Sequence, residues 1–170
     1  MAEIELFILR HGVAEAAADP PSGGDSQRPL TSEGVDKMRR AAKGMETLEL
    51  SFDLIFTSPL LRARQTAEIV ADVFGIGKRL QETPTLAPDG NPKELIDLLR
   101  KQHRHDRKLL LVGHEPYLSR LISFLTSGDT RTSIDLKKGA LCKLTSSSLE
   151  YGRCASLEWL MTSRQLRRHA

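Results

Sequence analysis

Three short segments hold residues that could act together on a phosphoryl group: Arg10-His11-Gly12, Ser58-Pro59-Leu60-Leu61-Arg62 and Gly113-His114-Glu115-Pro116. Arginine offers planar, permanently charged donors to phosphate oxygens, and a helix N-terminus adds backbone N–H groups. A neutral imidazole can attack phosphorus and form a covalent intermediate. Gly12 favours a sharp turn that would leave the His11 side chain exposed. These residue types predict phosphoryl chemistry that needs no metal.

Each of these segments directly follows an expected strand. Apolar runs over residues 4–9, 53–57 and 108–113 show little alternation, which is typical of strands covered on both faces. In open α/β sheets, ligands bind beyond the carboxyl ends of the strands. We therefore expect the histidines and arginines of the three segments to converge at one edge of a sheet.

The rest of the chain predicts alternating helices and further strands. A long loop is expected over residues 12–29, which are rich in Ala, Asp, Pro, Ser and Gly. Helices are expected after Thr31, from Ser58 as N-cap with Pro59 at the first helical position, from Asn91-Pro92, and between Pro116 and Gly128. Further strands are expected near 79–82, 139–144 and 155–161, so that the chain ends in extended pairing.

This order of elements predicts an α/β fold, a three-layer α/β/α sandwich around a mostly parallel, roughly six-stranded sheet. A chain of 170 residues can bury one core without disulfides or a structural metal, so a single domain over residues 1–170 is expected. Cys142 and Cys154 are expected to be buried thiols, because they are too few for a disulfide framework and lack zinc-site spacing.

The composition excludes several classes of protein. No apolar run approaches the roughly 20 residues of a membrane span, and the first residues lack the pattern of a signal peptide. We therefore expect a protein of the cytoplasm that does not bind membranes. A monomer is also expected. The net charge is only +3 and aromatic residues make up 5% of the chain, which disfavours a nucleic-acid binder.

No metal or other cofactor is expected. His103-Arg104-His105 has the spacing of metal ligands on a strand, but it lies between Arg100-Lys101 and Arg107-Lys108, which repel a cation. We interpret it as an exposed helix end. The sequence also lacks the signatures of cysteine phosphatases, phospho-aspartate enzymes and nucleoside-triphosphate loops.

The motifs resemble those of a known family. Arg10-His11-Gly12, Ser58 to Ala63 with Gln65-Thr66-Ala67, and Gly113-His114 are similar in order and spacing to the histidine phosphatase, or phosphoglycerate-mutase-like, superfamily. The similarity runs from the first expected strand to the last. Arg28-Pro29-Leu30-Thr31 and the short chain resemble the SixA-type phosphohistidine phosphatases within it.

The resemblance implies a role for each matching residue. His11 would form a phosphohistidine intermediate, while Arg10, Arg62 and His114 hold the phosphoryl oxygens. Arg28 would be a further contact to phosphate or substrate. Ser58 and Gly12 are also assigned to substrate binding.

The function expected on these grounds is a phosphohistidine phosphatase that acts on a phosphohistidine-bearing protein, such as a phosphotransfer domain, and releases phosphate. One alternative is a phosphatase for small phosphate esters, or a mutase. Another is a binding module without turnover, against which the nucleophile His11 argues.

Several charged residues have more than one interpretation. Arg64 is expected on a solvated helix surface, whereas Glu115 could favour the following helix N-terminus or orient an imidazole. No acid that protonates a leaving group is assigned, and Glu82, Asp89 and Glu15 are candidates. The enzyme should therefore prefer phosphoramidates and activated aryl esters to alkyl phosphates.

Overall fold

The computed structural model describes residues 2–17, 24–102 and 104–170, and its centre is a six-stranded sheet in the order β3-β2-β4-β1-β5-β6. The strands are β1 (Ile4–Arg10), β2 (Leu54–Thr57), β3 (Leu80–Glu82), β4 (Lys108–Gly113), β5 (Leu141–Ser146) and β6 (Ser156–Met161). β1 to β4 are mutually parallel, whereas β5 and β6 join as an antiparallel pair beside β1. The mostly parallel sheet is therefore confirmed.

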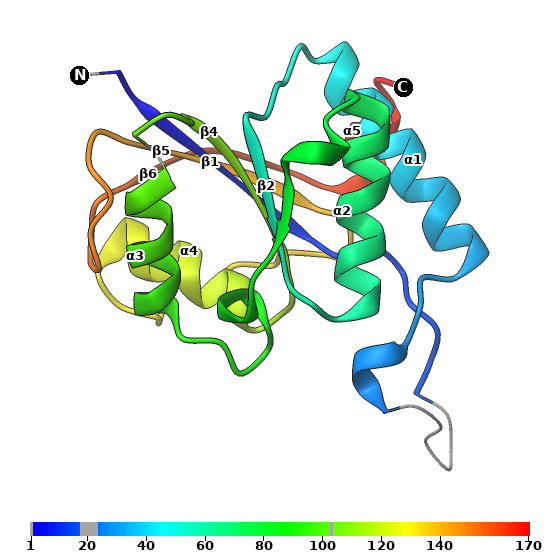
Figure 1. Cartoon of the computed structure of the whole chain (residues 1–170), viewed down its shortest axis with the longest axis horizontal. Helices are drawn as coiled ribbons and strands as arrows, with labels where there is room; N and C mark the ends of the chain where they lie inside the picture. Colours follow the sequence, from blue (N-terminus) through cyan, green and yellow to red (C-terminus); the bar gives the residue numbers. More distant parts are fainter. Residues whose placement is uncertain (1, 18–23, 103) are drawn as a thin grey trace.

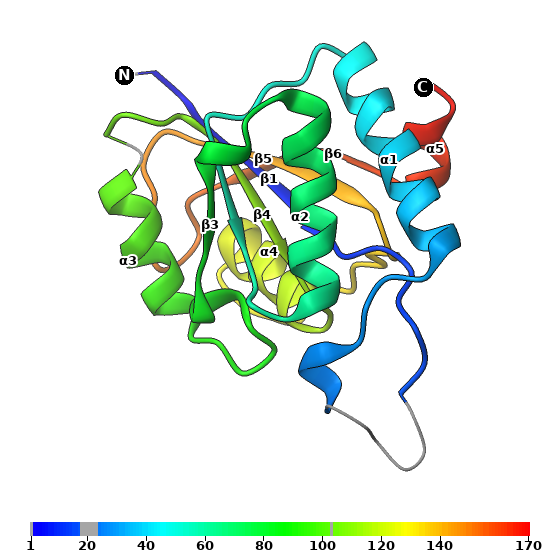
Figure 2. The same cartoon turned by 45° about the vertical axis from the view of Figure 1, so that its right-hand side comes forward.

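Helices cover both faces of this sheet. They are α1 (Ser32–Thr47), α2 (Leu61–Phe74), α3 (Pro92–Gln102), α4 (Tyr117–Ser127) and α5 (Ser163–Arg167). Helices α1, α2 and α5 lie on one face, and α3 and α4 lie on the other (Figures 1 and 2). Each face has its own apolar core. The expected three-layer α/β/α sandwich is confirmed.

Strand β1 explains why the apolar runs are continuous. Leu6 and Ile8 belong to the core beneath α3 and α4, whereas Phe7 and Leu9 belong to the core beneath α1 and α2. All four are at most 1% exposed. Burial of such a side chain contributes about 1.5–3 kcal/mol, so both faces hold the strand in register and fix where it ends.

The starts of two helices test the predicted caps. Thr31 caps α1, because its hydroxyl accepts a hydrogen bond from Gly34 N at 2.8 Å. The cap predicted for the next helix is wrong, since α2 begins at Leu61 and not after Ser58. Ser58 instead accepts a hydrogen bond from Leu60 N and contacts His114, so its hydroxyl is used outside the helix.

The end of the chain also differs from the prediction. After β6 it forms α5, which opens with a capping box between Thr162 and Gln165. The helix packs on α1 at Gly44, where an added Cβ would lie 1.9 Å from the carbonyl oxygen of Leu166. No larger residue fits there without displacing the backbone. A Thr followed three residues later by Gln, as in Thr162 and Gln165, is typical of a helix start. The alternating apolar pattern of the preceding strand hid this signal in the sequence.

The remaining sequence predictions have mixed outcomes. In the described part of the expected loop over residues 12–29, Asp25–Gln27 form a 3-10 turn, and residues 18–23 lie outside the described ranges. Cys142 is buried as expected, but Cys154 is half-buried. His103 also falls outside the described residues, while Arg104 and His105 are exposed. Across the described ranges, no helix has the length and apolar character needed to cross a membrane.

Candidate active site

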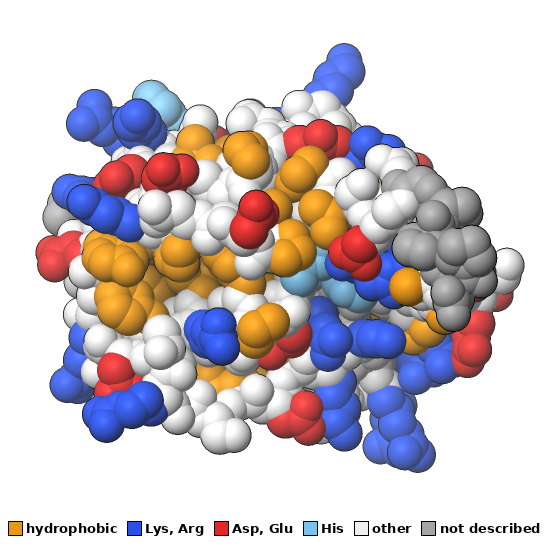
Figure 3. Space-filling view, turned by 90° about the horizontal axis from the view of Figure 1, so that it is seen from below, with side chains coloured by type: hydrophobic (Ala, Val, Ile, Leu, Met, Phe, Trp, Pro, Cys, Tyr) orange, Lys and Arg blue, Asp and Glu red, His pale blue; other side chains and the backbone are white. Residues whose placement is uncertain are grey.

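A pocket opens at the carboxyl edge of the sheet, where β1 and β4 end and α2 begins. It has a volume of about 420 Å³ and includes His11, His114 and Arg62 in its lining. The other lining residues are Arg10, Ala14, Asp25, Arg28, Pro88, Glu115 and Lys138. Figure 3 shows the histidine side chains recessed between a hydrophobic area and a group of Lys and Arg side chains. The structure thus brings Arg10, His11, Arg28, Arg62 and His114 together.

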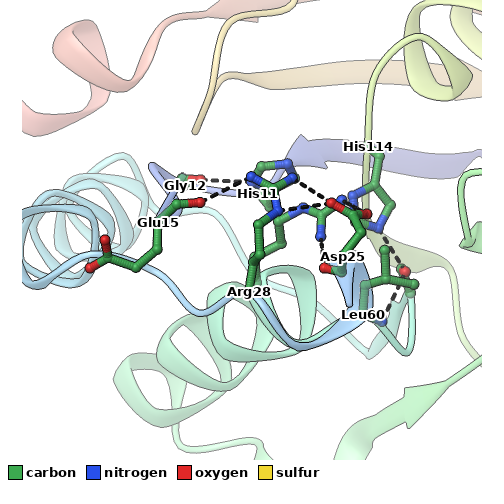
Figure 4. A network of polar contacts seen from close by, with 9 residues as sticks. His11, Gly12, Glu15, Asp25, Arg28, Leu60 and His114 are labelled. Carbon is green, nitrogen blue, oxygen red and sulfur yellow. Dashed lines mark hydrogen bonds and ion pairs between the residues drawn. The ribbon is translucent and has the colours of Figure 1, made fainter. Parts of the chain in front are cut away.

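A backbone carbonyl holds the His11 imidazole in one tautomer. Its Nδ1 lies 2.7 Å from the carbonyl oxygen of Gly12, a contact visible in Figure 4. A carbonyl oxygen can only accept, so Nδ1 carries the proton and Nε2 keeps its lone pair. The backbone N–H of His11 donates to Gly113 O at 3.0 Å, which ties the ends of β1 and β4 together.

The expectation that His11 would be exposed is wrong, because the residue is only 6% exposed. Its pKa is lowered from 6.5 to about 3, chiefly by burial and in addition by the nearby His114, Arg62 and Arg10, against the opposing effect of the Gly12 hydrogen bond. The imidazole is therefore neutral at physiological pH. A neutral ring with a free Nε2 is the nucleophilic form of histidine.

His114 stands beside His11, with 5.2 Å between the ring centroids. Its Nε2 lies 2.7 Å from the hydroxyl oxygen of Ser58, which also accepts a hydrogen bond from Leu60 N at 3.2 Å. In the tautomer in which the Ser58 hydroxyl donates to Nε2, the ring proton of His114 resides on Nδ1. Burial, followed by the charge of Arg62, lowers the pKa of His114 to about 4.

Three buried nitrogen atoms of the pocket residues have no hydrogen-bond partner within the described part of the chain: Arg10 Nε, Arg62 Nε and His114 Nδ1. A buried donor left unpaired costs about 1–3 kcal/mol, so such groups call for an explanation. Their positions in one cationic pocket suit an anion with several oxygens. Inorganic phosphate and phosphoryl groups have this chemistry.

Asp25 is a pocket residue that sequence reasoning missed. Its carboxylate accepts from Arg28 Nε at 2.8 Å and from Arg62 Nη2 at 3.0 Å, while its carbonyl accepts from Arg62 Nη1 at 2.9 Å. Figure 4 shows Arg28 reaching toward Asp25 beside the two histidines. Burial alone would raise the pKa of Asp25, but the hydrogen bonds from Arg62 and Arg28 outweigh it and the pKa lies below its ordinary value.

Gly12 and Thr66 support the pocket from behind. The backbone N–H of Gly12 donates to the Thr66 hydroxyl at 3.1 Å, and that hydroxyl donates to Arg62 O at 2.8 Å. This chain of bonds links the end of β1 to the first turn of α2. The sharp turn expected at Gly12 is absent: its φ is not positive, and an added Cβ would make ordinary contacts, such as 3.5 Å to Leu30. Neither Gly12 nor Ser58 lines the pocket.

The two carboxyl groups of described residues that line the pocket, those of Asp25 and Glu115, are already engaged. Glu115 lines the pocket, but its Oε1 accepts from Ser119 N at 2.8 Å in the first turn of α4. Glu115 is expected either to stabilise the N-terminus of the following helix or to orient an imidazole. This contact fits the first of these two roles. Glu82 lies outside the pocket and pairs with Arg64 at 3.4 Å on the α2 surface, where Arg64 is solvated as expected. Asp89 and Glu15 do not line the pocket either.

Comparisons with known proteins agree with this geometry. The family model of the histidine phosphatase superfamily (branch 1) matches residues 6–87. A protein of Picosynechococcus sp. is 39% identical over 146 residues, covering 85% of this chain and 87% of the relative. The phosphohistidine phosphatase SixA of Escherichia coli is 32% identical over 128 residues, covering 75% of this chain and 77% of SixA. A structure of the protein histidine phosphatase SixA complexed with tungstate has a TM-score of 0.82 and 27% identity, covering 96% and 99% of the two chains.

Proposed function

The chain belongs to the histidine phosphatase superfamily, and we propose that it removes phosphate from phosphohistidine on a protein through a covalent intermediate on His11. Phosphatase activity is the shared chemistry of the matching SixA proteins. One observation carries the proposal. The hydrogen bond from His11 Nδ1 to Gly12 O leaves Nε2 unprotonated inside a cationic pocket.

In the first step, the Nε2 lone pair of His11 forms a bond to phosphorus while the bond from phosphorus to the substrate nitrogen breaks. The electron pair of the broken bond stays on the departing ring, which leaves as neutral imidazole when its other nitrogen is protonated. Nε of Arg10 and Arg62 and Nδ1 of His114 donate to the phosphoryl oxygens. These donors act on charge that spreads over the oxygens in the transition state.

In the second step, a water oxygen bonds to phosphorus and the bond from phosphorus to Nε2 breaks. The water proton passes to solvent, and phosphate leaves with its oxygens still facing the same donors. Nδ1 of His11 keeps its proton and its hydrogen bond to Gly12 O throughout, so the ring can carry positive charge while it is phosphorylated. The unmodified His11 is then regenerated.

The ease with which the leaving group departs makes a phosphoramidate a better substrate for this pocket than an alkyl ester. The described pocket carboxylates are those of Asp25 and Glu115, and both already accept hydrogen bonds from cations or backbone. Without a free acid, an alkoxide leaves poorly, and general acid catalysis is typically worth about 10²–10⁴-fold. A protonated imidazole has a pKa of about 6.5, so solvent can supply its proton near neutrality. The matching SixA proteins carry the same substrate in their names.

This proposal is tested by kcat/KM on three substrates under one set of conditions: a phosphorylated histidine phosphotransfer domain, p-nitrophenyl phosphate and an alkyl sugar phosphate. We expect the first two to be turned over and the sugar phosphate to lag by about 10²-fold or more. Equal turnover of the sugar phosphate would instead favour the alternative, a phosphatase for small esters. Binding of phosphate without any turnover would favour a binding module.

We retain three further points as proposals. No metal is assigned a role, so a chelator should leave turnover unchanged. The thiols of Cys142 and Cys154 are both free, which suits the reducing cytoplasm. We also propose that the enzyme acts as a monomer.

A further inference from the structure

A second hollow adjoins the pocket on the same face of the molecule. It has a volume of about 330 Å³, and its lining includes Pro88, Pro116, Tyr117 and Phe124. Pro88 lines both hollows, and Pro116 directly follows the pocket residue Glu115. Figure 3 shows the hydrophobic side chains of this face in a band that reaches the recessed histidines. We call this second hollow the apolar groove.

Aromatic side chains dominate one wall of the apolar groove. The ring of Tyr151 packs on that of Phe124 with 4.6 Å between centroids, and Tyr151 is 51% exposed. Tyr151 and Leu157 are the large hydrophobic residues exposed to this degree in the described ranges, and only Tyr151 borders the groove. Exposed tyrosine in a shaped, apolar hollow is typical of residues that contribute strongly to protein–protein binding.

One polar group of the apolar groove is already engaged within the chain. The Tyr117 hydroxyl already donates to Thr85 O at 2.6 Å, so it is not available to a ligand. Small-molecule sites usually orient their ligand with several converging polar groups. Arg120 borders the groove, is exposed, and makes no side-chain hydrogen bond or ion pair with any described residue. The groove therefore offers apolar contact together with one accessible cation.

We propose that the apolar groove docks the protein substrate while its phosphohistidine occupies the pocket. This inference rests on the proposed function and adds the kind of surface that the enzyme recognises. The matching face of the substrate would carry an exposed apolar side chain and an acidic group beside the phosphohistidine. Its negative charge would complement Arg120 at the groove and Arg28 and Lys138 at the pocket.

Two substitutions probe the apolar groove without touching the pocket. Tyr151→Ser removes the exposed ring, and Leu157→Ser is its control, since Leu157 is 50% exposed but does not line the groove. Arg120→Glu reverses the cation, and Arg100→Glu makes the same charge change on α3, away from both the groove and the pocket. Each variant is assayed on free phosphohistidine and on a phosphotransfer domain that has an exposed leucine or phenylalanine and a carboxylate next to its phosphohistidine.

The expected result is a rise in KM of about tenfold or more for the phosphorylated domain in Tyr151→Ser and Arg120→Glu, with kcat/KM for free phosphohistidine unchanged. The two control variants should match the wild type on both substrates. An unchanged KM for the domain would overturn the docking surface while leaving the proposed function intact. Loss of activity on free phosphohistidine instead would overturn the docking surface and show that the groove binds small leaving groups. If the wild type hydrolysed neither phosphohistidine substrate, the proposed function itself would fail.

Discussion

The Oδ2 atom of Asp25 lies 3.0 Å from Nη2 of Arg62, so an internal carboxylate holds the guanidinium whose Nε the proposed mechanism directs at phosphate. The Arg62 side chain is 6% exposed and that of Asp25 is 57% exposed, so solvent reaches this pair from the carboxylate side. Asp25 also contacts Arg28. In the free protein, these two arginines are thus held in place by an anion of their own chain.

Removal of the Asp25 charge should therefore strengthen phosphate binding. In Asp25→Asn, the amide oxygen can still accept from an arginine, but the repulsion between carboxylate and phosphate is gone. We expect the inhibition constant of inorganic phosphate to fall by about tenfold, as measured by competition with p-nitrophenyl phosphate. Glu82→Gln, which makes the same charge change at Arg64 outside the pocket, is the control. Weaker inhibition in Asp25→Asn would mean that the carboxylate is needed to position the arginines.

Ser58 should act through His114. In the proposed mechanism the Ser58 hydroxyl, 2.7 Å from Nε2, donates to that nitrogen and so favours a proton on Nδ1. Ser58→Ala removes this hydroxyl. We expect kcat to fall by about tenfold and the His114 ring to shift toward the Nε2-protonated tautomer, which ¹⁵N NMR distinguishes. The His11 tautomer, fixed by Gly12 O, serves as the internal control. An unchanged His114 spectrum together with a lower melting temperature would assign Ser58 a packing role only.

Stability should fall on the acid side because of the buried histidines. The pKa of His11 is lowered from 6.5 to about 3 and that of His114 to about 4 in the fold. Between these values and about 6.5, the unfolded chain binds protons that the folded chain does not, so the free energy of unfolding rises with pH in this window. Each group contributes up to about 1.4 kcal/mol per pH unit.

Urea unfolding of the wild type and of His11→Asn between pH 4.5 and 6.5 measures this slope. The variant should show a shallower dependence, because it lacks one of the two groups that take up a proton on unfolding. Above about pH 7 the slopes should coincide, which is the control. Identical slopes across the acid range would contradict the neutral, buried state of His11.

The sequence predicted the parts of the fold that depend on local pattern. Strands β1 and β4 are buried on both faces, so their apolar runs and their ends were visible, and with them the convergence of His11 and His114. The start of α2 could not be predicted from the sequence, because Ser58 contacts His114, 56 residues away, instead of capping a helix. Helix α5 was missed because the alternating pattern of β6 continues to its start.

The missing part of the site depends on contacts between distant segments. Asp25 lies in a loop-like stretch of polar residues, and nothing in its neighbourhood indicates that it reaches Arg62, 37 residues away. Thr66 belongs to a motif that resembles the family, but its hydrogen bond from Gly12 N depends on the three-dimensional structure. The depth of His11 was also misjudged, since a residue at the end of a strand can be enclosed by loops that periodicity does not describe.

The central claim is that His11 carries the phosphoryl group during turnover. Wild-type protein and His11→Asn are mixed with a phosphorylated histidine phosphotransfer domain, quenched within the first turnovers, and digested at alkaline pH for mass spectrometry. We predict an acid-labile phosphate on His11 in the wild type, none on the variant, and no turnover by the variant. Phosphate on another residue, or sustained turnover by His11→Asn, would contradict the account.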